Sequence, residues 1–289
     1  MSQSKQLVWL ITGTSSGMGR NLSLAALARG DKVIATARHN SLAKLDDIKA
    51  EGAESIGLDV TASLDELKET AKAAVEIYGR VDVLVNNAGY MLVGALEENT
   101  PEETLNQFNT NVFGALNVAR AFLPYMRERK SGTIVWLGSV GGWQGNPSFG
   151  VYCASKHAVR ALSQTLNVEI SPLGLRSICV ELGAFRTAFL SAGSRSSYTP
   201  RIDDYKQITT RSTAGVEAFN QKQPGDPKKG VQVIIDLVRG EGVAEGKGKD
   251  EIPGVINLGS DCYETVKGVC EGNLKRLEAW KDVSKSTDF

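Results

Sequence analysis

Short apolar segments rich in β-branched residues alternate with helical segments along most of this chain, and this alternation constrains the fold more than any other feature. Such uninterrupted apolar runs are typical of strands that are buried on both faces of a parallel sheet. We therefore predict an α/β fold with a doubly wound parallel sheet, forming a single domain over residues 1–289. The expected strands are Gln6–Thr12, Lys32–Arg38, Glu54–Val60, Val81–Asn86, Thr133–Leu137, Arg176–Glu181 and Val255–Leu258.

Helix signals between these strands support the same fold. Apolar residues recur at helical spacing across residues 64–78. The segment Thr100-Pro101-Glu102-Glu103 combines a cap residue, a proline in the first turn and a glutamate three residues after the cap, so it predicts a helix start. Asp226-Pro227 predicts a second helix start with an apolar stripe behind it.

Two segments depart from the alternation. Residues 188–225 follow the sixth strand, where an open α/β sheet places its ligand crevice, and we expect them to form a substrate lid. Residues 242–289 form a C-terminal extension with a helix that should begin near Asp261, with Glu264 completing a capping box. This extension is expected to pack on the outside of the molecule or on a partner subunit.

Composition argues against several other classes of function. The chain has 33 basic and 33 acidic residues, a formal net charge of +0, which disfavours nucleic-acid binding. Four cysteines without a CxxC pair and only two histidines predict no metal site. No segment reaches the roughly 20 apolar residues of a membrane span, and none resembles a signal peptide. We therefore expect free thiols, no membrane partner and a cytoplasmic location.

A glycine-rich turn follows the first predicted strand and opens a helix. Glycine permits a tight turn, lets backbone N–H groups approach a pyrophosphate and allows the helix to pack close to the strand. Such turns also serve as plain connections, but this position favours a dinucleotide site of the Rossmann type. The residues expected to contact the cofactor here are Gly13, Ser15, Ser16, Gly17, Met18 and Gly19.

The end of the second predicted strand bears on the choice between NAD and NADP. A chain that prefers NAD usually places an acidic residue here for the ribose 2′-hydroxyl. This chain has Thr36-Ala37-Arg38-His39 and no carboxylate. Arg38 could pair with the 2′-phosphate of NADP, although considered alone it could equally be a solvated arginine. The missing acid favours NADP (NADPH), and NAD is the less favoured cofactor.

Tyr152 and Lys156 form the pattern that most directly indicates catalysis. They are four residues apart, so on a helix they project from the same face. A free tyrosine ionises at about pH 10, and a nearby ammonium group would stabilise the phenolate and lower the tyrosine pKa. The tyrosine could then serve as a general acid or base. Considered alone, the pair could also be an incidental surface pair.

Several motifs occur in order on the expected elements. Thr12-Gly13-x3-Gly17-x-Gly19 follows the first strand, and Asn86-Asn87-Ala88-Gly89 follows the fourth. Ser139 ends the fifth strand, and Asn111 lies in the helix that the capped threonine at position 100 opens. Together with the Tyr-x3-Lys pattern, these residues resemble the short-chain dehydrogenase/reductase family over roughly Leu7 to Val238.

The resemblance implies a role for each of four residues. Tyr152 would be the general acid for carbonyl reduction and the base for alcohol oxidation. Ser139 would bind and orient the substrate oxygen and stabilise the developing alkoxide. Lys156 would lower the tyrosine pKa and hold the nicotinamide ribose, while Asn111 would position a water in a proton relay. Hydride would pass between the nicotinamide and the substrate carbon.

The resemblance also implies further contacts to the cofactor. One departure lies after the sixth strand, where the family commonly has Pro-Gly and this chain has Leu182-Gly183, which loses the fixed φ of proline. This departure affects the expected shape of the nicotinamide pocket and leaves the cofactor class unchanged. The additional residues expected at the cofactor are Asp59, Val60, Asn87, Ala88, Gly89, Gly183, Phe185 and Thr187.

The substrate is less well defined by the sequence. An apolar pocket for a hydrophobic ketone or secondary alcohol could be lined by Tyr90, Met91, Leu92, Trp143, Phe149, Phe185 and Phe189, although these could equally be core or interface residues. An anionic substrate could meet the basic side chains of the lid, for which a solvated face is the competing interpretation; they are Arg195, Arg201, Lys206 and Arg211.

Two alternatives to a carbonyl/alcohol oxidoreductase remain open from the sequence. One is a regulatory protein that senses dinucleotide without turnover, which the intact Tyr152 and Lys156 pattern disfavours. The other is an epimerase, dehydratase or imine reductase that uses the same hydride and proton chemistry. The family resemblance further implies a homodimer or homotetramer whose only other partner is a small-molecule substrate.

Overall fold

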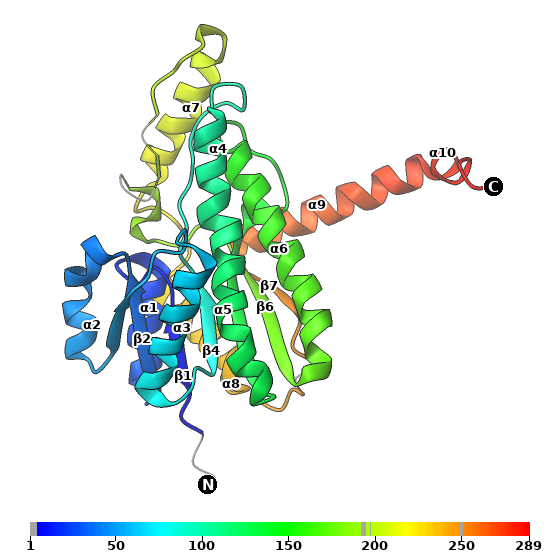
Figure 1. The fold of residues 1–289 in the computed structure, drawn as a ribbon. Coiled ribbons are helices and arrows are strands. Elements are labelled where there is room, and N and C mark those ends of the chain that lie inside the picture. The colour runs from blue at the N-terminus through cyan, green and yellow to red at the C-terminus, as the bar shows by residue number, and fades with distance from the viewer. Residues whose placement is uncertain (1–4, 192–194, 197, 249–250) are drawn as a thin grey trace.

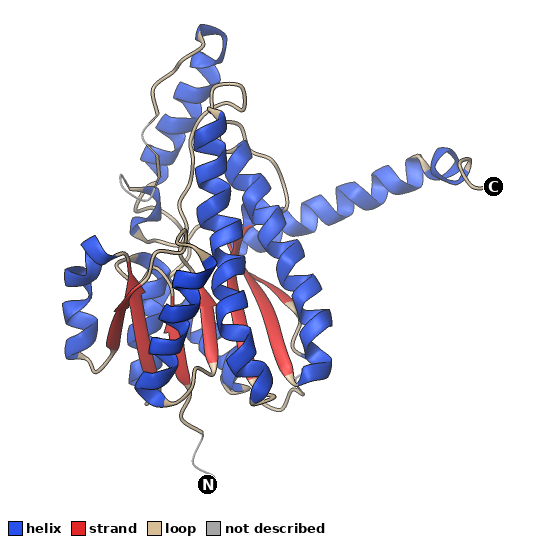
Figure 2. Ribbon diagram, viewed as in Figure 1, coloured by secondary structure: helices blue, strands red, loops and turns tan. Residues whose placement is uncertain are grey.

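Seven parallel strands form one central sheet (Figure 2). The computed structural model describes residues 5–191, 195–196, 198–248 and 251–289. The strand order is β3-β2-β1-β4-β5-β6-β7, which confirms the predicted doubly wound α/β fold. The strands are β1 Val8–Ile11, β2 Lys32–Ala37, β3 Glu54–Gly57, β4 Val83–Asn86, β5 Gly132–Ser139, β6 Leu175–Leu182 and β7 Val255–Leu258.

Helices cover both faces of the sheet and create two separate apolar cores. One core lies between the sheet and α3, α5 and α6, with Phe122 and Val159 fully buried in it. The other lies between the sheet and α1, α2 and α8, and it buries Leu22 and Ile234. The helices are α1 Gly17–Ala28, α2 Asp46–Ala50, α3 Leu64–Tyr78, α4 Pro101–Phe108, α5 Ala115–Glu128, α6 Gly150–Ile170, α7 Asp203–Phe219, α8 Pro227–Arg239, α9 Ser260–Ala279 and α10 Lys281–Lys285.

All seven predicted strands are present, and their ends differ from the prediction by a few residues. The largest difference is in β3, which ends at Gly57 rather than Val60, so that Asp59 follows this strand instead of closing it. Burial on both faces holds for the central strands β1 and β4. It is wrong for β3 and β7, because these strands lie at the two edges of the sheet and remain partly accessible to solvent.

All three predicted helix starts are confirmed, but one of the two predicted capping boxes is wrong. Thr100 and Glu103 form the expected capping box at α4, and the Asp226 carboxylate accepts a hydrogen bond from the Lys228 N–H at α8. The capping box at Asp261 does not form, because α9 begins at Ser260 and its N-cap residue is a glycine without a side-chain bond. The carboxylate of Asp261 is directed to a different part of the chain.

The two predicted insertions contain helices of their own. Helix α7 lies within residues 188–225, above the carboxyl ends of the strands (Figure 1). Helix α9 starts at the end of β7 and projects away from the sheet, with α10 at its tip (Figure 1). Large apolar side chains on the projecting part are exposed, namely Leu274, Leu277, Trp280 and Val283. None of the helices in the described part of the chain has the length and apolar character that a bilayer span requires.

Candidate active site

The glycine-rich turn joins β1 to α1 and leaves backbone donors free at the start of the helix. Gly13 and Gly17 have φ angles of 68° and 62°, which side-chain-bearing residues rarely adopt. A Cβ atom at Gly19 would lie 2.4 Å from Asn87 Nδ2, so the close approach of the two loops requires glycine there. The N-cap residue Ser16 makes no side-chain bond to the helix N–H groups, and no acidic residue occupies the first turn. This cradle fits a pyrophosphate.

Hydrogen bonds fix the loop after β4 against this turn. Thr12 Oγ1 accepts from the backbone N–H groups of Asn87 and Ala88, both at 3.0 Å. Asn87 Nδ2 in turn donates to the Thr12 and Gly13 carbonyl oxygens at 2.6 and 2.9 Å. The two motifs found separately in the sequence therefore form one rigid surface.

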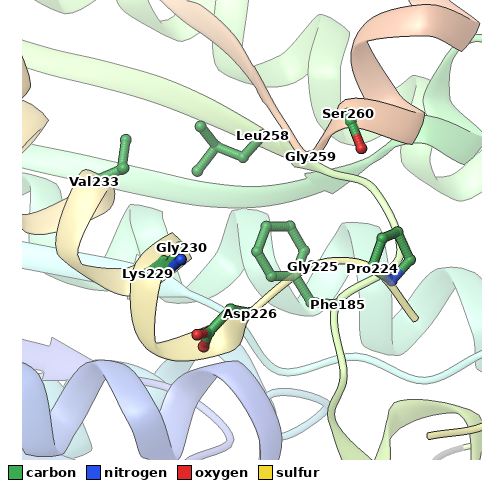
Figure 3. A pocket seen from close by; sticks show the side chains of 10 residues that line it. All are labelled: Phe185, Pro224, Gly225, Asp226, Lys229, Gly230, Val233, Leu258, Gly259 and Ser260. Carbon is green, nitrogen blue, oxygen red and sulfur yellow. The ribbon is translucent and has the colours of Figure 1, made fainter. Parts of the chain in front are cut away.

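The loop after β6 reaches the same turn from the other side. A Cβ atom at Gly17 would lie 3.9 Å from Thr187 Cβ, so Thr187 and Gly17 are neighbours. Phe185 belongs to this loop, but its ring packs against Gly225 and Gly230 at the start of α8. The ring lines a cavity of about 270 Å³. Figure 3 shows it between α8 and the start of α9. Of the two residues of this loop expected at the cofactor, Thr187 lies beside the glycine-rich turn. The Phe185 side chain lies against the start of α8 instead.

The ends of β2 and β3 carry the residues expected near the adenosine. Arg38 is exposed directly after β2. Partial burial raises the pKa of Asp59, but hydrogen bonds from Thr61 and the positive charges of Arg38 and His39 bring it below its usual value. Arg38 is thus close enough to influence a carboxylate at this edge.

Two of the expected cofactor residues turn their side chains away from the site surface. The side chain of Val60 packs in the core beneath α3 and α5. That of Met18 packs in the core beneath α1. Only the backbone atoms of these two residues could contact a ligand.

Tyr152 and Lys156 project together from α6 into the interior. Both residues are buried, at 8% and 9% exposure. Lys156 Nζ lies 5.8 Å from the centre of the Tyr152 ring and donates a 2.7 Å hydrogen bond to the Leu137 carbonyl oxygen on β5. The Leu137 carbonyl holds the lysine ammonium in place beneath the tyrosine. The four-residue spacing noted in the sequence places both side chains on one face of α6, and this face is buried.

Ser139 stands at the carboxyl end of β5, beside the same tyrosine. Its Oγ accepts a 3.1 Å hydrogen bond from the Gly141 N–H, which leaves the hydroxyl proton available to another acceptor. A Cβ atom at Gly141 would lie 3.4 Å from Tyr152 Cε1 and 3.5 Å from Ser139 Oγ. Gly141 therefore lies next to both the serine hydroxyl and the tyrosine ring.

Burial controls the protonation of these groups. It raises the pKa of Tyr152 to about 12, and a hydrogen bond with Ser139 opposes this effect. It lowers the pKa of Lys156 to about 8, because the ammonium is removed from water. The tyrosine is thus a protonated acid across the physiological range, and the lysine beneath it exchanges a proton near that range.

Asn111 lies in a π-helical turn, Asn109–Gly114, that joins α4 to α5. It therefore lies in the helix that begins after Thr100, as predicted, and the π-helical turn is a local widening of that helix. Asn111 Oδ1 accepts from the Tyr90 N–H at 3.1 Å, and Nδ2 donates to the Tyr90 carbonyl oxygen and to Ser155 Oγ at 3.1 and 3.2 Å. A Cβ atom at Gly89 would lie 3.0 Å from Asn111 Oδ1. The proton relay through this residue stays a prediction.

An apolar cluster surrounds the Tyr152 ring. The rings of Tyr152 and Phe189 lie 6.0 Å apart and are tilted by 48°. Trp143, which the sequence suggested for this wall, instead donates its indole N–H to Glu181 and stacks on Arg160. The cluster around Tyr152 consists of Met91, Val93, Phe149, Cys153, Phe189, Leu190 and Tyr198. Val93, Cys153, Leu190 and Tyr198 carried no sequence signal that distinguished them from core residues.

Carboxylates of the chain bind the described part of residues 188–225. The buried Glu98 accepts hydrogen bonds from the Tyr198 hydroxyl and from the Arg201 and Ile202 N–H groups. Arg201 also binds Glu103 through both nitrogens, at 2.7 and 2.6 Å. Glu217 on α7 pairs with Arg195 at 3.0 Å. These two arginines therefore bind carboxylates of the chain itself, which favours a structural role over recognition of an anionic substrate.

The described residues contain no group of three or more His, Cys, Asp or Glu side chains arranged to hold a metal ion. All four cysteines are free thiols.

Comparison with known proteins places this geometry in a family. Residues 7–196 match the sequence profile described as short chain dehydrogenase. The 3-ketodihydrosphingosine reductase of Bacteroides thetaiotaomicron is 37% identical over 235 residues, which cover 79% of this chain and 82% of that protein. A short-chain dehydrogenase from Streptomyces avermitilis, solved by crystallography, is 38% identical with a TM-score of 0.86, and the match covers 100% of both chains.

Two more distant structures contain nicotinamide cofactors. A short-chain dehydrogenase/reductase from Burkholderia phymatum, in complex with NAD, is 25% identical with a TM-score of 0.76, covering 92% of this chain and 94% of that one. An actinorhodin polyketide ketoreductase with NADPH is 28% identical with a TM-score of 0.72, covering 89% and 97%. Both cofactors therefore occur among structures similar to this one.

The burial of Tyr152 predicts its titration. In protein without added cofactor, the ultraviolet absorbance of tyrosinate should be the same for the wild type and for Tyr152→Phe between about pH 7 and about pH 10, because the Tyr152 proton is retained. After unfolding in denaturant, the wild type should show one additional tyrosinate at high pH. An extra tyrosinate in the folded wild type below about pH 9 would contradict the dominance of burial.

Proposed function

We propose that this chain, which belongs to the short-chain dehydrogenase family and is therefore an oxidoreductase, interconverts a carbonyl group and a secondary alcohol with NADP(H) as the cofactor. One observation carries the proposal: the buried Tyr152, the lysine beneath it and the Ser139 hydroxyl converge at the carboxyl ends of β4 and β5, beside a cradle that fits a dinucleotide. The bound nicotinamide supplies or accepts the hydride.

The protein residues divide the remaining chemistry among themselves. Ser139 donates a hydrogen bond through its hydroxyl to the substrate oxygen, keeping its own proton, and orients the carbonyl toward Tyr152. Tyr152 donates its phenolic proton to that oxygen during reduction and accepts one back during oxidation. The phenolate that forms is stabilised by the Lys156 ammonium 5.8 Å from the ring, and this charge interaction is strong because the site is buried.

NADP is supported over NAD by the end of β2. Arg38 is exposed there, and no acidic residue lies between Thr36 and His39 that would repel a 2′-phosphate. Asp59 lies near the same edge, but Thr61 binds its carboxylate through both the backbone N–H and the hydroxyl. The guanidinium is therefore the group best placed to recognise the additional phosphate of NADP.

A hydrophobic small molecule is supported as the substrate. The walls around Tyr152 are apolar, and the described lid arginines 195 and 201 are bound to carboxylates of the chain. The proposed lid, residues 188–225, contributes Phe189 and Tyr198 to these walls. Sphingoid ketones and polyketides, named for two of the similar proteins, are of this chemical kind.

An epimerase, a dehydratase or an imine reductase would use the same residues as a carbonyl reductase. A protein that only senses dinucleotide would have no need of a buried acid beside a free serine hydroxyl.

Self-association is supported by apolar side chains that the single chain leaves exposed on α4, α6 and the turn after α4. They are Leu105, Phe113 and Val168. A homodimer or homotetramer would cover them. The cytoplasmic location expected from the sequence stays a prediction.

Tyr152→Phe tests the proposed chemistry. Loss of the phenolic proton should lower the turnover of NADPH with an apolar ketone by at least about 100-fold, because general acid catalysis is removed. NADPH binding, followed by nucleotide fluorescence, should persist. Tyr263→Phe is the matched control, because Tyr263 is exposed on α9. Unchanged turnover in Tyr152→Phe, with a functional control, would contradict the assignment.

Arg38→Asp tests the cofactor preference. The variant should weaken NADPH binding by about 10-fold to about 100-fold, because a charge-assisted contact is replaced by repulsion. NADH binding should change little. Lys49→Asp makes the same change of charge on α2, at an exposed residue on the same side of the sheet, and should leave both affinities close to wild type. Equal losses for NADPH and NADH in Arg38→Asp would refute the 2′-phosphate role.

A further inference from the structure

The C-terminal extension contacts the loop after β6 through a carboxylate. Asp261 Oδ2 accepts a 2.7 Å hydrogen bond from the Ala184 N–H. The Gly183 N–H donates to the Leu258 carbonyl oxygen at 2.8 Å. Two consecutive N–H groups of the loop are thus held by the short segment 258–261, although these residues lie more than seventy positions further along the chain.

Two glycines are required for this contact. A Cβ atom at Gly183 would lie 2.2 Å from Asp261 Oδ1, and one at Gly259 would lie 2.7 Å from the same oxygen. Gly259 also has a φ angle of 106°, which makes the sharp turn that directs Asp261 back toward the loop. The glycine after Leu182 is therefore needed for the approach of this carboxylate.

The opposite side of the loop is held by the segment before α8. The Gly225 N–H donates to the Ala184 carbonyl oxygen at 3.0 Å, and the Arg186 N–H donates to the Gly225 carbonyl oxygen at 2.9 Å. Figure 3 shows the Phe185 ring between this segment and the turn at Gly259. Ala184 thus has both its N–H and its carbonyl bound, and Thr187, three residues later, lies beside the glycine-rich turn.

The position of Asp261 leaves one of its carboxylate oxygens without a hydrogen bond. Its Oδ1 atom is buried and has no hydrogen-bond partner. An unsatisfied carboxylate oxygen is unfavourable, so its presence calls for a reason other than the stability of α9. The residue before Gly183 is Leu182, which does not fix its own φ as proline would. The Asp261 carboxylate restrains the backbone two residues later, at the Ala184 N–H.

We propose that Asp261 is a positioning residue for hydride transfer. By fixing the Gly183–Ala184 peptide it holds the loop that leads to Thr187, and so determines where the nicotinamide half of the cofactor is held. The first residues of the C-terminal extension thereby contribute to cofactor positioning, although most of α9 projects into solvent. This proposal rests on the function proposed above.

The test separates the two halves of the cofactor. NADPH spans both the glycine-rich turn and the loop after β6, whereas 2′,5′-ADP carries the adenosine half alone. Asp261→Ala should weaken NADPH binding by about 10-fold and lower kcat by about 10-fold to about 100-fold, because small misplacements of reacting groups have effects of this size. Binding of 2′,5′-ADP should stay within about 2-fold of wild type, since the turn at Gly13 is not touched.

Two further variants make the result interpretable. Asp261→Asn keeps an oxygen that can accept from the Ala184 N–H, so it should restore most of the NADPH affinity and kcat. Glu264→Ala changes an exposed carboxylate one turn further along α9 and should behave as wild type.

Four outcomes would contradict part of the account. Normal NADPH binding and kcat in Asp261→Ala would overturn the role of Asp261, and so would an equal loss of 2′,5′-ADP binding, which would indicate general damage. Failure of Asp261→Asn to restore function would show that the Ala184 hydrogen bond is not the cause. A wild-type chain that binds neither ligand would contradict the proposed function itself.

Discussion

The site depends on keeping an ammonium group and a phenol together in an apolar interior. Lys156 can be buried because the Leu137 carbonyl oxygen accepts a 2.7 Å hydrogen bond from its ammonium group. That carbonyl belongs to β5, the strand that also ends in Ser139. The same burial that raises the pKa of Tyr152 to about 12 lowers that of Lys156 to about 8. At physiological pH, Tyr152 is therefore protonated, and Lys156 beneath it exchanges a proton near that pH. Because the site is buried, solvent screens the charge interaction between the two side chains only weakly.

The parallel sheet brings the remaining parts to this pair. Because all seven strands run in one direction, the turns after β1, β4, β5 and β6 meet at one edge. Hydrogen bonds between Thr12 and Asn87 join two of these turns, and the contact between Gly17 and Thr187 joins a third. Segments that are more than a hundred residues apart in the chain thus form one surface, and Glu98 anchors the segment before α7 through the Arg201 N–H.

Much of this arrangement could be predicted from local patterns. The alternation of apolar runs and helical stripes predicted the parallel sheet with helices on both faces, and the capping box at Thr100 and the Tyr152–Lys156 spacing predicted geometry that the structure contains. Features that depend on distant contacts were not predictable. The π-helical turn at Asn111, the ion pairs of Arg201 and the rotation of the Phe185 ring all depend on which segments meet after folding. Local sequence predicts Asp261 as a helix cap, whereas its partner in the structure, the Ala184 N–H, lies far away in the sequence.

The proposed function requires this chain to transfer hydride between a nicotinamide and a carbonyl carbon. The most direct measurement uses NADPH with deuterium at both hydrogen positions of nicotinamide C4, a panel of apolar ketones and mass spectrometry of the products. We expect at least one ketone to be reduced, and its alcohol to carry the deuterium on the carbon that bore the oxygen. A chain that binds NADPH but transfers no deuterium to any carbonyl compound would contradict the account and support a dinucleotide sensor instead.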